Sequence, residues 1–431
     1  MKKIYSLDST LRSVARRKHM PVMDLLLHRI SEFSSHSARN YTLFAVCPNS
    51  VAVIRAALRA AKRANAPLNF AATLNQVDVD GGYTGFTQRE FVKLIRQEAA
   101  AINFTGPVII AVDHGGPWLR DNQRTAGWPY EKTMKWVKKS FEAALLAGYD
   151  LLHVDPTIDI TMTGSSMPVD LVISRTIELI DHIEGFRKKM GIGPVAYEVG
   201  TEEVHGGLAD MTVFTGFLRG LKSWLQKSGY KQVWPCFIVG KVGTDLHTTV
   251  FDSDIAAKLV SEAHRYGSWI KGHYTDNVDN PEAYPISGMG AANVGPEFTE
   301  SEYEALIELE NIESQLFSGG KIPRKSKMKQ VLWQTVLQSN RWQKWLKGDE
   351  IIIPFERLDM RRQEWLIKTG CRYIWANPEV QSARMRLYQN LSVHGIRADD
   401  IVMTAIEKKM HKYFTVFNLV DLNEILQQGM Q

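Results

Sequence analysis

The feature that most constrains the fold of this chain is an alternation of short apolar runs with helical patterns, which begins near Asn40. Strands are expected near residues 41–46, 68–73, 107–112, 150–154, 194–199, 234–239, 268–272 and 287–294. Helices are expected near residues 50–65, 87–103, 130–147, 168–190, 210–228, 252–266 and 299–316, whereas the seventh connection, 276–285, is short and contains proline. Such alternation closes a (β/α)8 barrel or forms an open doubly wound sheet. Eight units favour the barrel, an α/β fold.

Two further regions flank the expected barrel at 39–318. Residues 1–38 carry spaced apolar side chains and are expected to form N-terminal lead-in helices. Residues 325–431 are expected to form a helical C-terminal region. Its aromatic residues include Trp333, Trp342, Trp345, Trp365, Tyr373 and Trp375. At this spacing we expect them to pack in a core or a subunit interface rather than stack on sugars or bases.

Composition argues against several classes of protein. The net charge of +5 is spread along the chain, which favours small anionic metabolites over nucleic acid. Three widely separated cysteines predict neither a disulfide framework nor a thiolate zinc site, which fits a cytoplasmic protein. The N-terminus has no signal-peptide core, and no apolar run is long enough for a membrane span. No G-x-G-x-x-G follows the first strand and no G-x-x-x-x-G-K-[ST] occurs, so no nucleotide site is indicated.

Candidate chemistry begins at the end of the third expected strand. A buried, β-branched run stops at Asp113 and His114, which precede Gly115, Gly116 and Pro117. In a barrel, polar residues at the carboxyl end of a strand are more often catalytic than structural, because the strand fixes them and the loop exposes them. The alternative is that Asp113 caps the next helix beside a hydrogen-bonded His114.

Three strand ends carry residues suited to a divalent metal. The candidate ligands are His114, Glu202 or His205, and His273, because imidazole and carboxylate are the usual ligands of catalytic zinc. Each has a structural alternative: Glu202 could cap a helix, His205 could be an exposed loop residue, and His273 could hydrogen-bond inside the rim. The other histidines considered are expected to be surface or packing residues; these are His153, His182, His247 and His264.

A metal at this rim could act as a Lewis acid on the carbonyl and hydroxyl of a ketose, stabilising the enediolate that forms when a proton or a carbon fragment is removed. Asp113, next to a ligand, would then be the base, and Glu202 is assigned a catalytic role as well as a ligand role. The cation is expected to be zinc, with manganese as the alternative. The remaining polar rim residues are expected to bind substrate: Asn75, Gln76, Asp155, Asp276 and Asn293.

The same residues carry a resemblance to a known family, the accessory, non-catalytic subunit of class II tagatose-1,6-bisphosphate aldolase. The similar motifs are N-Q-V-x-x-x-G-G-Y-T-G (75–85), D-H-x-G-P (113–117), H-x-D (153–155), G-T-E (200–202), H-x-T-D (273–276) and V-G-P (294–296). Their order and spacing match from about residue 40 to 316, and an R-Y-x-W segment (372–375) is similar too.

The resemblance implies a (β/α)8 relative of zinc-dependent ketose-bisphosphate aldolases. It implies that Asp113 matches the proton-transfer aspartate, that His114 is a zinc ligand, and that Glu202 and His273 fall on further ligand positions. Some members are implied to be C4-epimerases of ketose 6-phosphates, and others are labelled tagatose-6-phosphate kinases, a label that no phosphate-cradling motif supports here. The fifth loop departs from the family pattern at Glu203 and His205, so the sugar is left open.

Two hypotheses follow. We favour a metal-dependent aldolase or epimerase of a phosphorylated ketose, because a purely structural subunit has no chemical reason to retain an acid and a ligand set. The alternative is a non-catalytic partner that stabilises a separate catalytic aldolase subunit through its aromatic helical region. In both cases we expect a homo-oligomer, as is common for barrels.

Overall fold

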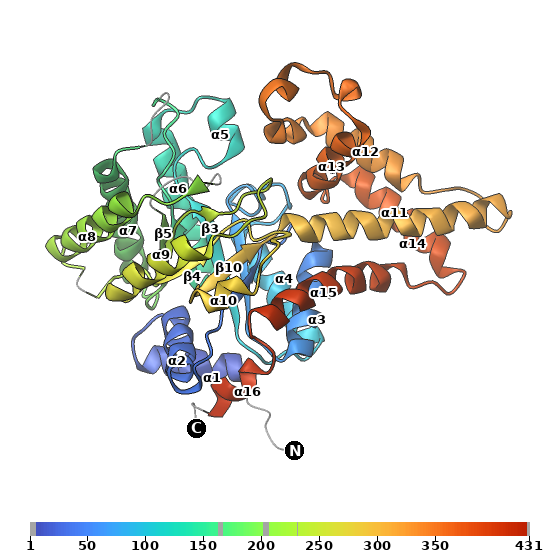
Figure 1. The fold of residues 1–431 in the computed structure, drawn as a ribbon. Coiled ribbons are helices and arrows are strands. Elements are labelled where there is room, and N and C mark those ends of the chain that lie inside the picture. The colour runs from blue at the N-terminus through green and yellow to red at the C-terminus, as the bar shows by residue number, and fades with distance from the viewer. Residues whose placement is uncertain (1–5, 163–166, 201–206, 231, 429–431) are drawn as a thin grey trace.

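The computed structural model describes residues 6–162, 167–200, 207–230 and 232–428. Its centre is a closed barrel of parallel strands (Figure 1), which confirms the predicted fold. The barrel strands are β1 (Leu43–Val46), β2 (Leu68–Thr73), β3 (Val108–Gly115), β4 (Leu151–Val154), β5 (Ala196–Gly200), β7 (Phe237–Val239), β9 (Trp269–Gly272) and β10 (Ala291–Val294). They follow one another in chain order around the barrel, and β1 closes the ring by pairing with β10.

Helices connect the strands, as the alternation predicts. They are α3 (Val51–Ala64), α4 (Gln88–Ala101), α5 (Asp121–Thr125), α6 (Tyr130–Ala147), α7 (Val169–Lys189), α8 (Met211–Lys227), α9 (Ser253–Arg265), α10 (Ala283–Ile286) and α11 (Pro296–Ser318). Several begin at side chains that accept hydrogen bonds from the first turn: Ser50, Thr87, Asp210 and Asp252. Helix α11 starts three residues earlier than expected, because Pro296 occupies its first turn without loss of a needed N–H donor.

A small antiparallel ribbon, which the sequence did not predict, joins two rim loops. Strand β6 (Gly207–Leu208) pairs with β8 (Val242–Gly243), so the loops after β5 and β7 are tied together above the barrel. Each strand has only two residues, too few for periodicity to reveal.

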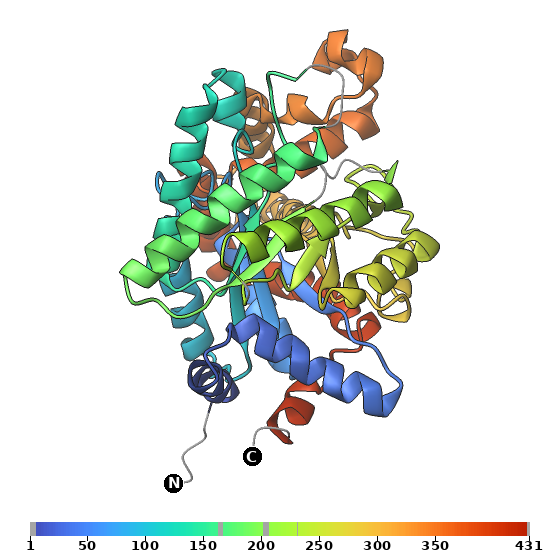
Figure 2. The ribbon, with the colours of Figure 1, turned by 90° about the vertical axis from the view of Figure 1, so that its left-hand side faces the viewer.

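The lead-in helices lie at the end of the barrel opposite the C-terminal helices within residues 328–392 (Figures 1 and 2). They are α1 (Leu7–Arg17) and α2 (Val22–Ser37). Arg12 of α1 donates hydrogen bonds of 2.6 and 3.0 Å to Asp150, just before β4, and one of 2.7 Å to the carbonyl of Val108. This attaches the N-terminal segment to the closed end of the barrel, away from the strand ends that carry the polar rim.

The C-terminal region consists of α12 (Met328–Ser339), η1 (Arg341–Trp345), η2 (Gly348–Ile352), η3 (Phe355–Arg357), α13 (Met360–Gly370), η4 (Cys371–Tyr373), α14 (Pro378–Ser392), α15 (Ala398–Val416) and α16 (Leu422–Gln428). Helix α15 packs on α3 and α11, where Tyr413 stacks on Phe44 of β1 at 5.3 Å between ring centroids. Helices α12–α14 gather beside α11 above the rim (Figure 1), so this region contributes to the open end of the barrel. In the described part of the chain no helix is long and apolar enough to cross a membrane.

Candidate metal centre at the barrel rim

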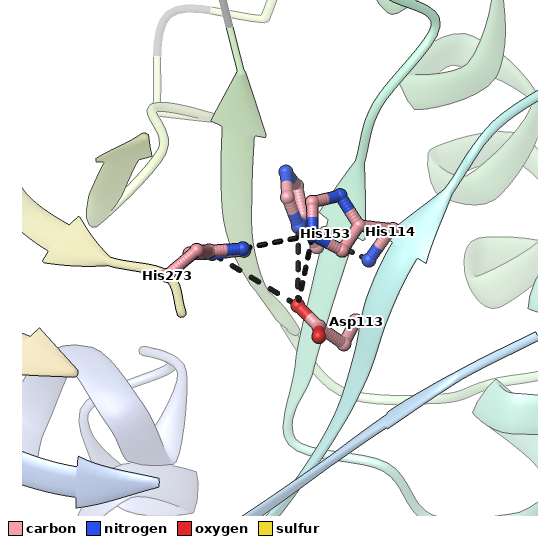
Figure 3. A group of neighbouring side chains, drawn as sticks. All are labelled: Asp113, His114, His153 and His273. Atoms are coloured by element: carbon pink, nitrogen blue, oxygen red, sulfur yellow. Dashed lines mark hydrogen bonds and ion pairs between the residues drawn. The ribbon is translucent and has the colours of Figure 1, made fainter. Parts of the chain in front are cut away.

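Four side chains from three strand ends meet at the carboxyl end of the barrel: Asp113 and His114 from β3, His153 from the neighbouring β4, and His273 from directly after β9, which is not adjacent to either strand (Figure 3). One nitrogen or oxygen of each lies within 4.8 Å of the corresponding atom of the others. Imidazole and carboxylate groups gathered this closely are a donor set for a divalent cation. The structure thus brings together three residues that the sequence analysis selected and one that it did not.

A β-bulge explains how consecutive residues Asp113 and His114 both reach the cluster. Regular strand residues alternate between faces, but here Asp113 and His114 together oppose the single residue His153, and the register shifts between Val112 and Gly115. His114 adopts a left-handed backbone conformation with φ of 49°. This conformation is uncommon for residues other than glycine, and it is found preferentially at functional sites.

The glycines after His114 let the loop lie directly on the end of β4. A Cβ atom on Gly116 would overlap the backbone carbonyl of Asp155, and one on Gly115 would lie 2.5 Å from the ring of Phe141. The D-H-G-G sequence therefore combines a bulge that aims two functional side chains with two positions where only glycine fits.

Carboxylates orient two of the three imidazole rings. Nδ1 of His114 lies 2.5 Å from Oδ2 of Asp155, and Nε2 of His273 lies 2.9 Å from Oε1 of Glu198. The remaining ring nitrogens, Nε2 of His114 and Nδ1 of His273, face each other at 2.8 Å. Metal-binding histidines generally use one nitrogen for the metal and donate the other N–H to a carboxylate, which fixes the tautomer.

Asp113 is buried beside positively charged groups. Its Oδ1 accepts a 3.1 Å hydrogen bond from Nδ2 of Asn293 on β10 and lies 3.5 Å from Nδ1 of His153. Burial is the largest single influence and raises the pKa of Asp113, but His114, His273, His153 and Lys271 together lower it to well below the usual range. The group is therefore a carboxylate, the form that a base or a ligand requires.

The two facing imidazoles differ in charge. Burial lowers the pKa of His114, but Asp113 and Asp155 together raise it to about 9. Burial lowers the pKa of His273 to about 4, in spite of the opposing effect of Asp113. These pKa shifts favour a protonated His114 that donates to a neutral His273 across the 2.8 Å between the two ring nitrogens.

His153 was expected to be a packing residue, and the structure corrects this. Its Nδ1 accepts a 3.1 Å hydrogen bond from the backbone N–H of His114, which supports the bulge. Its Nε2 is buried without a partner among the described residues. The H-x-D spacing was a usable signal, because residues two apart in a strand share a face and Asp155 was already selected.

Glu198 and Lys271 were also missed. Both are buried, and Nζ of Lys271 donates a 2.6 Å hydrogen bond to Oε2 of Glu198 across β7. The charge of Lys271 offsets the burial of Glu198 and contributes to lowering its pKa to about 2. A single charge inside a short apolar strand requires a partner, and this was the signal available in the sequence.

The residues expected to bind substrate lie around the cluster, and most of their polar groups are already used by the protein. Asn75 bridges to the loop before α5, donating to the carbonyl of Leu119 at 2.9 Å. Gln76 donates to the carbonyl of Pro48 at 2.8 Å. Asp276 accepts from the N–H groups of Gly295 and Glu297 and thereby fixes the start of α11, while burial raises its pKa to about 7. Glu202 and His205 lie outside the described residues.

The cluster opens into a pocket that is lined by polar and charged side chains of the barrel and of the C-terminal region. Asp113, His114 and His273 line one part of it, together with Asn75, Gln76, Asp276 and Asn293. The C-terminal region lines another part through Arg341, Lys344, Trp345, Arg372 and Tyr373. The aromatic residues Trp345 and Tyr373 thus lie at the pocket rather than only in a core.

Fold and site define a class: a (β/α)8 barrel with donor groups at the rim that fit a divalent metal. The family described as D-tagatose-1,6-bisphosphate aldolase subunit GatZ/KbaZ-like matches residues 28–415, and the chain belongs to this family. The family relationship indicated by the sequence motifs is therefore confirmed.

Two solved structures show the same fold. A probable tagatose 6 phosphate kinase from Sinorhizobium meliloti 1021 is 21% identical, with a TM-score of 0.72, over 87% of this chain and 100% of that one. Fructose-bisphosphate aldolase from Campylobacter jejuni is 13% identical, with a TM-score of 0.54, over 92% of this chain and 95% of that one. At these identities the similarity concerns the fold alone.

Proposed function

We propose that this chain is a metal-dependent enzyme that acts on a ketose phosphate by aldol cleavage or by epimerisation at C4. The observation that carries the proposal is the pair of nitrogens, Nε2 of His114 and Nδ1 of His273, that face each other beside Asp113 while Asp155 and Glu198 hold the other side of each ring. Family membership supports carbohydrate chemistry related to the aldolases.

Each residue of the cluster has a distinct proposed role. His114 and His273 hold the cation, with Asp113 close enough to serve as a further ligand or as the base. The cation, zinc or manganese, supplies Lewis-acid polarisation of a carbonyl or hydroxyl oxygen when bound. Asn293 fixes the orientation of the Asp113 carboxylate, which accepts the proton from the sugar hydroxyl or from the carbon next to the carbonyl. From the sequence, Glu202 remains a proposed ligand and catalytic residue, and His205 remains the alternative ligand.

Elemental analysis of protein purified without chelator tests the proposal, with a His114→Ala/His273→Ala double variant beside it. We expect near-stoichiometric zinc or manganese in the wild type and none in the double variant. His182→Ala is a matched control, because His182 is bound to Glu142 away from the pocket. A wild type that neither contains nor takes up a divalent metal would sink the proposal.

A second candidate is a partner subunit without catalysis of its own. The family is described as that of an aldolase subunit, and the C-terminal region exposes Ile351 and Ile352 by 68% and 83% and Met360 by 84%. Adjacent exposed apolar side chains of this kind often mark a protein interface. The double variant separates the two candidates, because an accessory effect on a catalytic aldolase subunit would survive it and catalysis by this chain would not.

A further inference from the structure

The cationic part of the pocket comes from two short helical turns of the C-terminal region, η1 and η4. Arg341 and Lys344 lie on η1, and Arg372 lies on η4. All three line the same pocket as Asp113, His114 and His273. The mechanism proposed above uses none of these cations.

Arg372 is buried without an anionic partner among the described residues. Only 7% of the residue is exposed, yet its Nε and Nη2 atoms are buried without hydrogen-bond partners among the described residues. Its guanidinium carbon lies 4.4 Å from the ring centroid of Trp345 and 4.9 Å from that of Tyr373. A buried guanidinium without a partner is unfavourable, so its position at the pocket points to an anionic ligand.

The charge of Arg372 persists in spite of burial. Burial lowers its pKa, but the neighbouring hydroxyls of Tyr373 and Tyr83 and the carboxyl of Asp276 contribute to raising it, and the net direction is upward. No carboxylate of the described residues forms an ion pair with Arg372. The guanidinium is therefore a preformed cation with free donors.

Arg341 and Lys344 share one carboxylate. Nη2 of Arg341 lies 2.5 Å and Nζ of Lys344 lies 3.1 Å from the oxygens of Asp121. Nε of Arg341 is buried and has no partner in the described part of the chain. With Arg372, three cations lie in this part of the pocket, and only Asp121 forms ion pairs with any of them among the described residues. Such a cluster of cations fits an anionic group such as a phosphate ester.

Aromatic rings hold the guanidinium groups in place. Arg341 lies 5.1 Å from the ring centroid of Tyr83 and 4.2 Å from that of Tyr373, while Nε1 of Trp345 donates a 3.0 Å hydrogen bond to the hydroxyl of Tyr373. Guanidinium groups stacked on rings lose little freedom when they bind an oxyanion through several N–H groups.

We propose that Arg372, Arg341 and Lys344 bind the phosphate group of the substrate, so that the C-terminal region supplies the phosphate site and the barrel supplies the metal site. The inference rests on the proposed function, which it deepens by assigning the recognition of the phosphate ester to named residues. It explains how a chain without a glycine-rich phosphate loop can select a phosphorylated sugar.

Calorimetric titration of the metal-loaded full chain tests this, with fructose 6-phosphate, inorganic phosphate, fructose and fructuronate as probes. We expect the wild type to bind the phosphate ester at least roughly tenfold more tightly than fructose, since each charged hydrogen bond contributes strongly. Arg372→Gln and Arg341→Gln should each remove most of that preference. Arg397→Gln is the control for net charge, because Arg397 is 81% exposed and lies outside the pocket.

Thermal unfolding provides a second test. Its expected result differs from the result expected if Arg372 had only a structural role. Arg372→Gln removes an unpaired buried charge, so its Tm in buffer should equal or exceed that of the wild type. Inorganic phosphate should raise the Tm of the wild type and of Arg397→Gln but not that of Arg372→Gln. If Arg372→Gln fails to fold, Arg341→Gln, whose side chain is 28% exposed, decides the question by titration.

The inference is overturned if the wild type binds fructose 6-phosphate no more tightly than fructose, or if fructuronate binds more tightly than the phosphate ester. Its failure is distinguishable from that of the proposed function. If the wild type holds the metal but shows no preference for the phosphate ester, only the proposed phosphate site is ruled out. If the chain holds no metal but prefers the phosphate ester, and Arg372→Gln abolishes that preference, the phosphate site is supported and the catalytic proposal is ruled out.

Discussion

Lys271 and Glu198 form a buried salt bridge of 2.6 Å, and the second oxygen of the same carboxylate lies 2.9 Å from Nε2 of His273. The three groups form a chain from the interior of the barrel to the rim. The lysine keeps the glutamate ionised, and the glutamate fixes the ring so that Nδ1 of His273 faces Nε2 of His114. The geometry of the candidate metal site thus depends on two residues that do not line the pocket.

The first prediction concerns this chain of contacts. Glu198→Gln removes the charge that orients His273, so metal affinity should fall about 10- to 100-fold, as is typical when the carboxylate behind a histidine ligand is lost. The same variant leaves Lys271 buried and unpaired, which should destabilise the fold by roughly 3–5 kcal/mol. Metal titration and chemical unfolding measure the two effects separately.

A double variant separates stability from metal binding. In Glu198→Gln/Lys271→Met the unpaired charge is gone, so stability should recover to a large extent while metal affinity stays low. If metal affinity recovered along with stability, the carboxylate would have no orienting role.

The second prediction concerns His153. Because its Nδ1 accepts the backbone N–H of His114, we expect it to position the bulge rather than hold the metal. His153→Asn offers an oxygen to the same N–H, so metal affinity should change by less than about tenfold. His114→Ala should abolish binding. Loss of metal in both variants would instead make His153 a ligand.

The barrel itself could be predicted from the sequence because each strand and helix carries its own periodicity, and eight repeats leave few alternatives. Asp113, His114 and His273 could be selected for a similar reason, since each follows an apolar strand directly. His153, Glu198 and Lys271 lie within strands, where the signals are weaker: the H-x-D spacing for His153, and a single charge inside a short apolar strand for Glu198 and Lys271. The bulge at His114 also has no periodic signal, although it decides where both functional side chains point.

Arg372 shows a different limit of sequence analysis. It stands next to Tyr373 and close to Trp375 in a segment whose aromatic residues suggested packing. Only the folded chain brings η4 from beyond residue 370 to strand ends near residues 113 and 273. Such long-range proximity depends on how the C-terminal helices pack on α11, and no local pattern encodes it.

The third prediction concerns the loop after β3. Gly116→Ala would place a Cβ atom into the carbonyl of Asp155, so the loop must move and carry His114 away from Asp155. We expect a loss of stability of roughly 2 kcal/mol or more together with a weaker metal site. Gly216→Ala in α8 is the matched control, because nothing lies within 4 Å of its added methyl group. There alanine should leave stability unchanged or raise it by up to about 1 kcal/mol.

Equal effects of the two glycine substitutions would show that close packing at Gly116 is unimportant. Thermal unfolding and metal titration, performed on both variants in parallel, give the comparison.

The last prediction concerns pH and Asp24 of α2, whose Oδ1 is buried without a partner among the described residues. Burial raises the pKa of Asp24 from 3.8 to about 7, although a hydrogen bond from Cys236 opposes this. Between these two values the folded chain binds more protons than the unfolded chain. Asp24 therefore contributes most to the stability of the fold below about pH 4. This contribution is lost as the pH rises through 7.

Asp24→Asn should remove this dependence, so that the variant is more stable than the wild type at pH 8 by a few kcal/mol, roughly 3 or 4 at most. At pH 5 the difference should be much smaller, because the carboxyl is already neutral in the folded wild type. Denaturant unfolding at several pH values measures the difference directly. Asp276, whose pKa is also raised to about 7, is present in both proteins, so its contribution cancels in the comparison. A difference in stability that does not change between pH 5 and pH 8 would mean that Asp24 is ionised in the folded protein throughout this range.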